Sequence, residues 1–129
     1  MKEAILVDTS VWINFFKGIE SPQVRTLTEY IQKDYPIYIC PTIIQEILQG
    51  IGNDKQYRSI KDHLLAFNIL NDDALAVALA SVEIYRSLRK KGISIRKSND
   101  CLIARYAFKY SLKILHQDRD FDMIQANYK

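Results

Sequence analysis

The stretch AILVDTSVWINFFKG, residues 4–18, decides the fold of this chain. Residues 4–7 are all apolar, which is typical of a strand buried on both faces of a parallel sheet. Asp8 follows at once, and a helix is expected at residues 10–17, closed by Gly18. An acid directly after a buried strand is either the cap of the next helix or part of a site at the edge of the sheet.

Apolar runs alternate with helical periods along the rest of the chain. Further strands are expected at residues 37–40, 67–70 and 112–116, and further helices at residues 21–34, 41–51, 53–66, 72–91 and 98–110. Alternating elements of these lengths predict an α/β fold, in which helices cover both faces of a parallel sheet through right-handed crossovers.

The composition limits the kind of protein. With 129 residues, of which 48% are hydrophobic and 26% charged, residues 1–129 are expected to form a single globular domain. The longest apolar run, residues 74–80, is too short to cross a bilayer, and Asp8 comes too early for a signal peptide. We therefore expect a cytoplasmic protein without membrane contact, in which Cys40 and Cys101 are buried free thiols.

Four acidic residues are candidates for one site. Asp8 directly follows the first strand, and Glu46 lies in the helix after the second. Asp100 lies in the first turn of the helix that leads into the last strand, and Asp118 directly follows that strand. Because ligands of parallel α/β sheets bind at the carboxyl ends of the strands, these four side chains are placed to converge on one crevice.

Each acid also has an ordinary explanation. Asp8 is a good helix cap, and Glu46 lies at the margin of an apolar stripe, where a solvated acid is common. For Asp118, Asp120 and Asp122, the ordinary explanation is that they are turn-forming acids on a loop. Asp100 differs because its helical position faces inward among small side chains, although a first-turn acid also suits a cap. No single acid is decisive.

Four motifs in one order are more specific than any single acid. The strings VDTSVWINFFKG, PTIIQEILQG, SNDCLIARYA and LHQDRDFDMI occur in this order between residues 7 and 124. Together they resemble the PIN-domain nucleases, in particular the VapC-like toxin ribonucleases of type II toxin-antitoxin systems. The resemblance implies a PIN-like three-layer α/β/α fold with a short, mainly parallel central sheet. It also implies a metal-dependent endoribonuclease that hydrolyses RNA phosphodiester bonds and is neutralised by a cognate VapB-like antitoxin.

Mapped onto this sequence, the resemblance implies a catalytic cluster of Asp8, Glu46, Asp100 and Asp118, with Ser10 as an accessory polar group. Asp120 is the alternative to Asp118, which is preferred because it lies closer to the end of the strand. The family resemblance suggests transfer RNA or ribosomal RNA as the substrate. The alternative function is a catalytically inactive PIN-like module that binds RNA or protein.

A cluster of carboxylates requires a counter-charge. Two carboxylates about 4 Å apart repel by roughly 4 kcal/mol at an effective dielectric constant of about 20, so the cluster stays ionised only when a cation joins it. Ligands that are all oxygen favour Mg²⁺ or Mn²⁺. Asp8 and Asp100 are the expected direct ligands, with Glu46 and Asp118 holding waters or a second ion. A water acidified by the metal can then attack a phosphodiester.

Basic and aromatic residues suggest how partners bind. The net charge of +3 permits a nucleic-acid partner, and Arg96 and Lys97, in the loop before Asp100, are either phosphate contacts or surface charge. The aromatic residues of the first helix, Trp12 and Phe15 with Phe16, either stack on bases or pack on the core or on a partner. Packing is favoured, since aromatics at helical spacing are usually packed. A homodimer or an antitoxin groove lined by the first helices is therefore a hypothesis.

Overall fold

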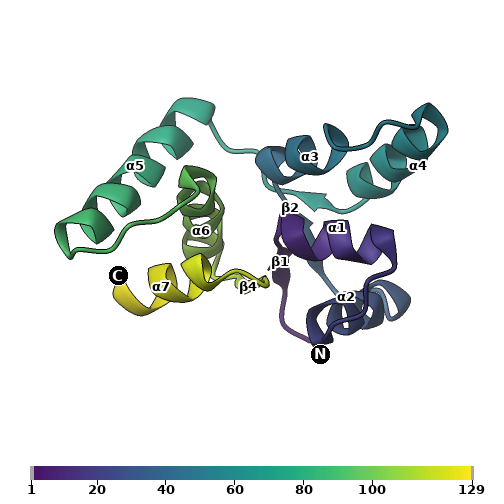
Figure 1. Ribbon diagram of the computed structural model, residues 1–129, viewed down its shortest axis with the longest axis horizontal. Coiled ribbons are helices and arrows are strands. Elements are labelled where there is room, and N and C mark those ends of the chain that lie inside the picture. Colours follow the sequence, from purple (N-terminus) through teal and green to yellow (C-terminus); the bar gives the residue numbers. More distant parts are fainter. Residues whose placement is uncertain (1, 129) are drawn as a thin grey trace.

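The computed structural model describes residues 2–128 and contains alternating strands and helices (Figure 1). In chain order the elements are β1 (Ile5–Val7), α1 (Thr9–Lys17), α2 (Pro22–Gln32), β2 (Ile37–Ile39), α3 (Pro41–Leu48), α4 (Asp54–Leu65), β3 (Asn68–Ile69), α5 (Ala74–Lys90), α6 (Ser98–Tyr110), β4 (Lys113–Leu115) and α7 (Arg119–Asn127).

The sheet has the strand order β3-β2-β1-β4, and all three pairings are parallel. The register places Ile5 beside Ile37 of β2 on one side and beside Lys113 of β4 on the other. Helices α1–α4 contact one another at one side of the molecule, and α5–α7 contact one another at the other side (Figure 1). The predicted α/β class and short parallel sheet are thus confirmed.

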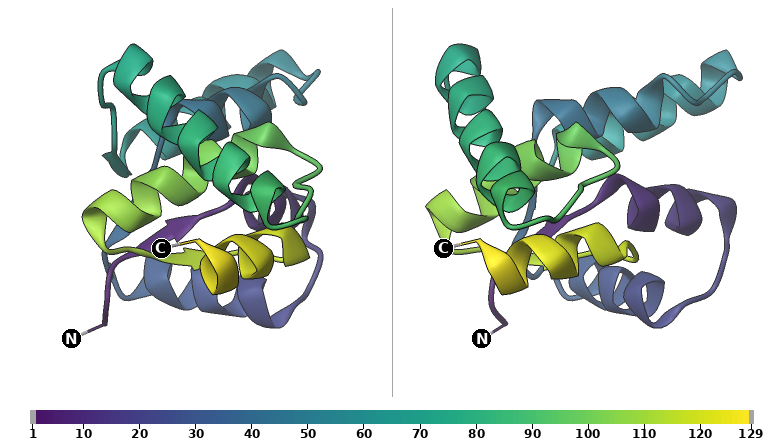
Figure 2. Two further views of the ribbon diagram at one scale, coloured as in Figure 1. Left: turned by 90° about the vertical axis from the view of Figure 1, so that its left-hand side faces the viewer. Right: turned by 60° about the vertical axis from the view of Figure 1, so that its left-hand side comes forward.

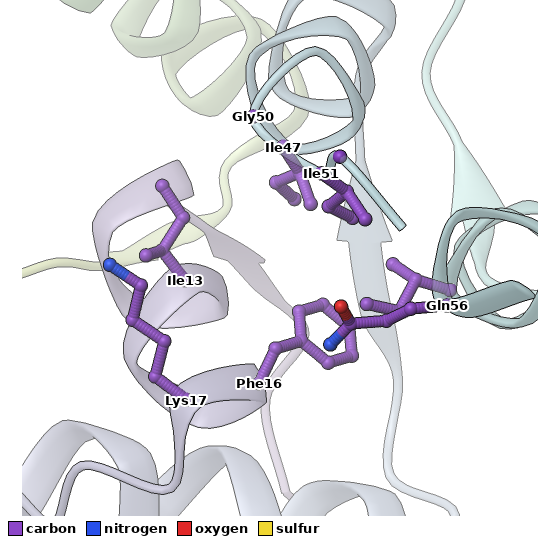
Figure 3. Close-up of a pocket in the computed structure, with 9 residues that line it drawn as sticks. Ile13, Phe16, Lys17, Ile47, Gly50, Ile51 and Gln56 are labelled. Carbon is purple, nitrogen blue, oxygen red and sulfur yellow. The ribbon is translucent and has the colours of Figure 1, made fainter. Parts of the chain in front are cut away.

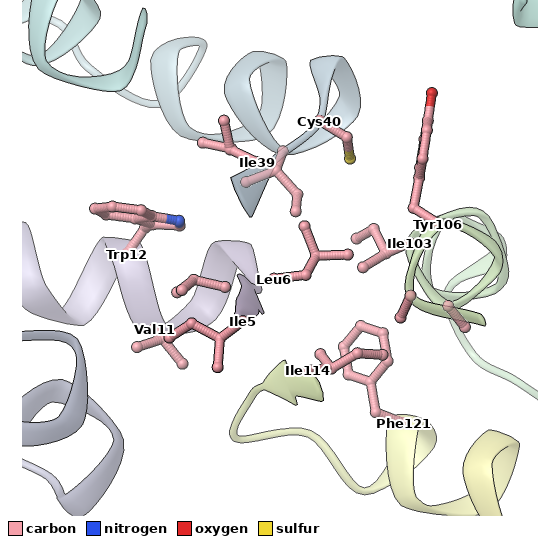
Figure 4. Close-up of a cluster of buried hydrophobic side chains, with 14 of the residues drawn as sticks. Ile5, Leu6, Val11, Trp12, Ile39, Cys40, Ile103, Tyr106, Ile114 and Phe121 are labelled. Carbon is pink, nitrogen blue, oxygen red and sulfur yellow. The ribbon is translucent and has the colours of Figure 1, made fainter. Parts of the chain in front are cut away.

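The core lies on both sides of β1. Ile5, Leu6 and Val7 are all buried, as expected for a central strand of a covered parallel sheet. Figure 4 shows Leu6 directed toward Ile103 of α6, whereas Trp12 of α1 lies on the opposite side of the strand. The two cysteines are free and buried, as predicted.

Local signals fix the ends of the first helix. Asp8 is the N-cap of α1, because its side chain accepts a hydrogen bond from the backbone N–H of Ser10. Gly18 ends the helix in the left-handed conformation with a φ of 72°, which a residue without a Cβ adopts without strain. Ser21, Asn53 and Asp73 cap α2, α4 and α5 in the same way, each with a side-chain oxygen that accepts a hydrogen bond from a backbone N–H in the first turn.

The alternative of turn-forming acids on a loop is wrong for residues 119–122, which are helical. These residues begin α7, with Asp118 as its N-cap and Asp120 in its first turn. The acids and their polar neighbours have the composition of a turn, but Phe121 and Ile124 are fully buried and hold the segment as a helix. Three buried positions in a nine-residue helix are too few for the sequence to show a clear helical period.

The aromatic residues of α1 are packed. Trp12 is only 1% exposed and lies against Phe15, Phe16 and Phe67, so it is not available to stack on a base. Packing was the favoured interpretation and is confirmed for this residue. No helix within residues 2–128 is both long enough and apolar enough to cross a membrane.

Candidate active site

The site lies where β1 and β4 end side by side. The backbone N–H of Asp8 donates a hydrogen bond of 2.9 Å to the carbonyl of Leu115, the last residue of β4. This bond continues the ladder one residue beyond the strand and brings the chain that follows β4 next to Asp8. The carboxyl ends of the two strands therefore meet, as the sequence predicts for a parallel sheet.

Three carboxylates form a compact group beside these strand ends. Asp100, Asp118 and Asp120 each present an oxygen, and these atoms all lie within 4.8 Å of one another. Asp100 comes from the first turn of α6, whereas Asp118 and Asp120 come from the start of α7. The two helix N-termini, which carry partial positive charge, favour the ionised carboxylates. The group includes both of the acids between which the sequence left a choice.

Asp100 is the most constrained acid. It is 4% exposed, and its buried Oδ2 has no hydrogen-bond partner within residues 2–128. Burial, followed by the negative charge of Asp8, raises the pKa of the Asp100 carboxyl to about 7. A buried oxygen without a partner is costly, and a cation among the three carboxylates would satisfy it. The residues present therefore fit a divalent metal ion with oxygen ligands.

Asp8 is both a cap and a member of the site. It is 5% exposed, and its Oδ2 accepts hydrogen bonds from the backbone N–H of Ser10 at 3.2 Å and from the Ser10 hydroxyl at 2.7 Å. Burial and, to a smaller extent, the negative charge of Glu46 raise the pKa of Asp8. The hydrogen bonds from Ser10 lower it, but the net shift is upward. The two explanations that the sequence left open are thus compatible.

Asp8 is not a member of the compact group of three acids within residues 2–128, and the pair of direct ligands expected from the sequence, Asp8 and Asp100, stays a prediction. The negative charge of Asp8 contributes to the raised pKa of Asp100.

Glu46 is oriented by two residues that the sequence analysis did not select. Thr9 donates a hydrogen bond of 2.6 Å to Oε1 of Glu46, and Asn99 donates one of 3.3 Å to Oε2. The three residues come from α1, α3 and α6, which converge at this point. Thr9 follows Asp8 and Asn99 precedes Asp100 in the sequence, so adjacency to a candidate acid was the available signal.

Arg96 and Lys97 face the acids. Arg96 Nη2 lies 2.9 Å from Asp118 Oδ1, and Lys97 Nζ lies 3.4 Å from Asp118 Oδ2. Asp120 Oδ2 accepts a hydrogen bond of 3.1 Å from the backbone N–H of Arg96, which ties the loop before α6 to the first turn of α7. Both basic side chains are 62% exposed, so they remain accessible at the rim of the site.

The acidic and basic side chains at the rim of the site shift the pKa values of one another. The carboxylates of Asp120 and Asp118 raise the pKa of Arg96. Burial alone would raise the pKa of Asp118, but the backbone N–H of Asp120 and the cations of Lys97 and Arg96 outweigh it and lower that pKa. Asp118 is therefore ionised at neutral pH. The neighbouring Asp100, with a pKa of about 7, is only partly ionised at the same pH.

A family model described as the PIN domain matches residues 5–127, and the chain belongs to this family. It is 35% identical over 123 residues to Ribonuclease VapC11 of Mycobacterium tuberculosis and to VapC ribonuclease Mb1587 of Mycobacterium bovis, covering 93% of this chain and 90% of each relative.

Solved structures share the fold. FitAcB from Neisseria gonorrhoeae matches with a TM-score of 0.72 and 23% identity, over 94% of this chain and 93% of that one. VapBC2 from Rickettsia felis, bound to a DNA fragment from its promoter, matches with a TM-score of 0.72 and 21% identity, over 94% and 92% of the two chains.

Proposed function

We propose that this chain is a VapC-like toxin, a metal-dependent endoribonuclease that hydrolyses phosphodiester bonds in RNA and is neutralised by an antitoxin. The observation that carries the proposal is the unpartnered, buried Oδ2 of Asp100 beside Asp118 and Asp120. Support comes from the relatives of 35% identity, which are named as ribonucleases. The proposed compartment is the cytoplasm.

The proposed cofactor is Mg²⁺ or Mn²⁺. Asp8 and Asp100 are the ligands proposed from the sequence, and the compact group adds Asp118 and Asp120 as donors. A bound divalent ion supplies charge neutralisation at the phosphate and an acidified water. The chain supplies the rest: Ser10 fixes the orientation of Asp8, and the hydrogen bonds from Thr9 and Asn99 hold Glu46 where it can orient the attacking water.

Arg96 and Lys97 are the proposed contacts to the RNA backbone. Their exposed cations lie at the rim of an acidic site that would otherwise repel a phosphate. Transfer RNA or ribosomal RNA is the proposed substrate class.

A VapB-like antitoxin is the proposed protein partner. A solved structure with the same fold, at 22% identity and a TM-score of 0.70, is a toxin-antitoxin complex from Klebsiella pneumoniae. A cavity of about 340 Å³ between α1, α3 and α4 is the candidate groove; its largely apolar lining includes Ile13, Phe16, Ile47 and Ile51 (Figure 3). The cavity is lined partly by α1, in agreement with the hypothesis of an antitoxin groove at the first helices, and partly by α3, the helix that carries Glu46. The test is co-purification with the small protein encoded by the adjacent reading frame, with Phe16→Ala expected to weaken the complex.

The purified protein, incubated with transfer RNA or ribosomal RNA, tests the activity. We expect cleavage with Mg²⁺ or Mn²⁺, loss of cleavage on chelation, and loss in Asp8→Asn and Asp100→Asn. Cleavage that persists without a divalent ion, or in both variants, contradicts the mechanism. RNA that is bound but not cut by the metal-loaded protein favours the alternative, a catalytically inactive PIN-like binding module.

A further inference from the structure

A cavity lies beside β4, at the edge of the sheet, and we call it the β4 cavity. It has a volume of about 620 Å³, and most of its lining residues are polar or charged. Helices α2 and α7 contribute its walls, and Figure 2 shows these two helices close together. β4 ends the strand order within residues 2–128, so its outer side carries backbone donors and acceptors that no strand pairs. A polar hollow of this size fits a small polar ligand.

The β4 cavity shares Asp118 with the candidate active site. Asp118 lines the cavity and also belongs to the compact group of three acids. When the phosphate of a nucleotide lies at these acids, a neighbouring base lies beside the cavity. Contacts to phosphates position a nucleic acid, whereas contacts to base edges select its sequence. The cavity is therefore placed to select a base.

Three amide side chains are joined by hydrogen bonds at the β4 cavity. Asn14 of α1 donates a bond of 2.7 Å to Oε1 of Gln117, and Nε2 of Gln117 donates one of 3.4 Å to Oε1 of Gln23 in α2. Gln23 and Gln117 line the cavity. An amide group has two donors and two acceptor lone pairs. Within residues 2–128, the Gln117 amide thus keeps one donor and one acceptor for a ligand.

His116 connects the active site to a carboxylate of the β4 cavity. The backbone N–H of Asp118 donates a hydrogen bond of 3.3 Å to Nδ1 of His116, so Nε2 is the ring nitrogen that carries the proton. Nε2 lies 3.4 Å from Oδ1 of Asp122, whose side chain is 73% exposed. The ring of Phe121 packs against the imidazole, with 5.1 Å between the centroids. The packed imidazole therefore orients the carboxylate of Asp122.

We propose that the β4 cavity binds the base next to the cleaved phosphate and that this base is guanine. The proposal rests on the proposed ribonuclease function and adds the base that the site selects. Arg119 and Asp122 both line the cavity and lie three residues apart on one face of α7. A guanidinium donates to O6 and N7 of guanine. A carboxylate accepts from N1–H and N2–H, which are adjacent donors on the Watson–Crick edge of guanine.

The carboxylate of Asp122 determines the preference for guanine. Adenine, cytosine and uracil each place an acceptor beside the donor on their Watson–Crick edge, and a carboxylate repels that acceptor. The Gln117 amide, with one donor and one acceptor, suits every base and adds affinity rather than selectivity. Asp122 is thus the proposed specificity-determining residue, and His116 positions it.

Equilibrium binding to four short RNAs tests the proposal without any cleavage. The probes are uridine oligomers with one central guanine, adenine, cytosine or uracil, and the protein is kept with a chelator. We expect the guanine oligomer to bind about 10-fold more tightly than the other three. Asp122→Asn should bring this ratio close to one, because an amide presents one acceptor oxygen instead of two. The variant also removes a negative charge, but that change acts on all four oligomers alike.

Asp62→Asn is the matched control, since it removes the same charge from an exposed position of α4 and should keep the ratio. Equal binding of the four oligomers by the parent overturns the proposal, as does a guanine preference that Asp122→Asn retains. If Asp122→Asn weakens the complex with the antitoxin and leaves the base preference unchanged, the cavity receives a protein segment and the proposal is also overturned.

Sequencing of the cut ends separates this proposal from the proposed function. With Mn²⁺, the parent should leave guanine beside the cut, and Asp122→Asn should cut without that preference. Cleavage by the parent with no base preference overturns the base site alone and leaves the ribonuclease function standing. Guanine-selective binding by a protein that cuts no RNA overturns the ribonuclease function and supports the base site.

Discussion

Thr9 donates a hydrogen bond of 2.6 Å to Oε1 of Glu46, and this bond joins the first turn of α1 to α3 across 37 residues of sequence. Asp8, which caps α1, immediately precedes Thr9. The bond therefore fixes Glu46 relative to Asp8 and accounts for the effect of Glu46 on the pKa of Asp8. Thr9 belongs to the site as a positioning residue.

Thr9→Val should lower the rate of RNA cleavage about 10-fold, because loss of a residue that orients a metal-site carboxylate typically costs that much or more. Fold stability should change little. Thr26→Val is the matched control: Thr26 is half-buried, and within residues 2–128 its hydroxyl bonds only the carbonyl of Pro22 in its own helix. The measurement is the cleavage rate at saturating Mn²⁺. Equal rates for the two variants would show that Glu46 needs no hydroxyl to orient it.

Asp100 should make the metal-free protein less stable as pH rises. Its folded pKa of about 7 lies above the ordinary value of 3.8, so the folded state binds the proton more tightly than the unfolded state. The free energy of unfolding contributed by this group is therefore present below about pH 4 and is lost as pH rises to about 7. Asp100→Asn removes the charge that causes the loss.

We accordingly expect Asp100→Asn to raise the melting temperature at pH 8 by several degrees in the presence of a chelator, and to have a much smaller effect at pH 5. Asp62→Asn, at an exposed position of α4, should change neither value. Thermal unfolding at both pH values is the measurement. A variant less stable than the parent at pH 8 would show that Asp100 is satisfied by its surroundings without a cation.

Local patterns in the sequence account for most of the elements and for the position of Asp8 and Asp118 at the ends of two strands. Apolar runs and capping residues predicted the strands and the ends of α1, because such signals depend on neighbours along the chain. The convergence of Asp8 and Asp118 followed from the rule for parallel sheets. The partners of Glu46 depend on how α1, α3 and α6 pack, which no local pattern encodes.

The apolar run at residues 74–80 illustrates the same limit. A run in which nearly every residue is apolar has no periodicity, so it cannot indicate which side of a helix faces the core. The structure buries Val77 and leaves Leu75 and Leu79 exposed. Helix α7 shows the opposite situation, a polar sequence with buried residues. Asp120 and Phe121 are buried because α7 packs against α5 and α6, which the sequence of α7 does not indicate.

Asp72 should stabilise the connection between β3 and α5. Its carboxylate accepts hydrogen bonds from Arg105 at 2.6 Å, from Lys109 at 2.7 Å and from the hydroxyl of Tyr110 at 2.6 Å. The bonds from Lys109, Tyr110 and Arg105 hold the pKa of Asp72 well below its usual range. Its contribution is therefore present above the ordinary carboxyl pKa and is lost only in strong acid. Asp72→Asn should lower the melting temperature at pH 7, whereas Asp62→Asn should not, and equal melting temperatures would contradict this role.

Arg96 and a divalent ion should compete for the same acids. The guanidinium lies 2.9 Å from Asp118 Oδ1 and 3.5 Å from Asp120 Oδ2, and both carboxylates belong to the group that fits a metal. Without the guanidinium of Arg96, the carboxylates of Asp118 and Asp120 attract a divalent ion more strongly. The surface also loses one positive charge that could bind an RNA phosphate. Arg96→Gln should therefore bind Mn²⁺ several-fold more tightly and RNA several-fold more weakly.

Calorimetric titration with Mn²⁺ and equilibrium RNA binding by the chelated protein measure the two effects separately. Lys90→Gln is the matched control, because it removes one exposed charge from the last turn of α5, and within residues 2–128 Lys90 forms no ion pair with Asp118 or Asp120. It should leave the affinity for Mn²⁺ unchanged and weaken RNA binding less than Arg96→Gln does. If Arg96→Gln weakens Mn²⁺ binding, the main role of Arg96 is to hold Asp118 and Asp120 in place for the ion, and competition is excluded.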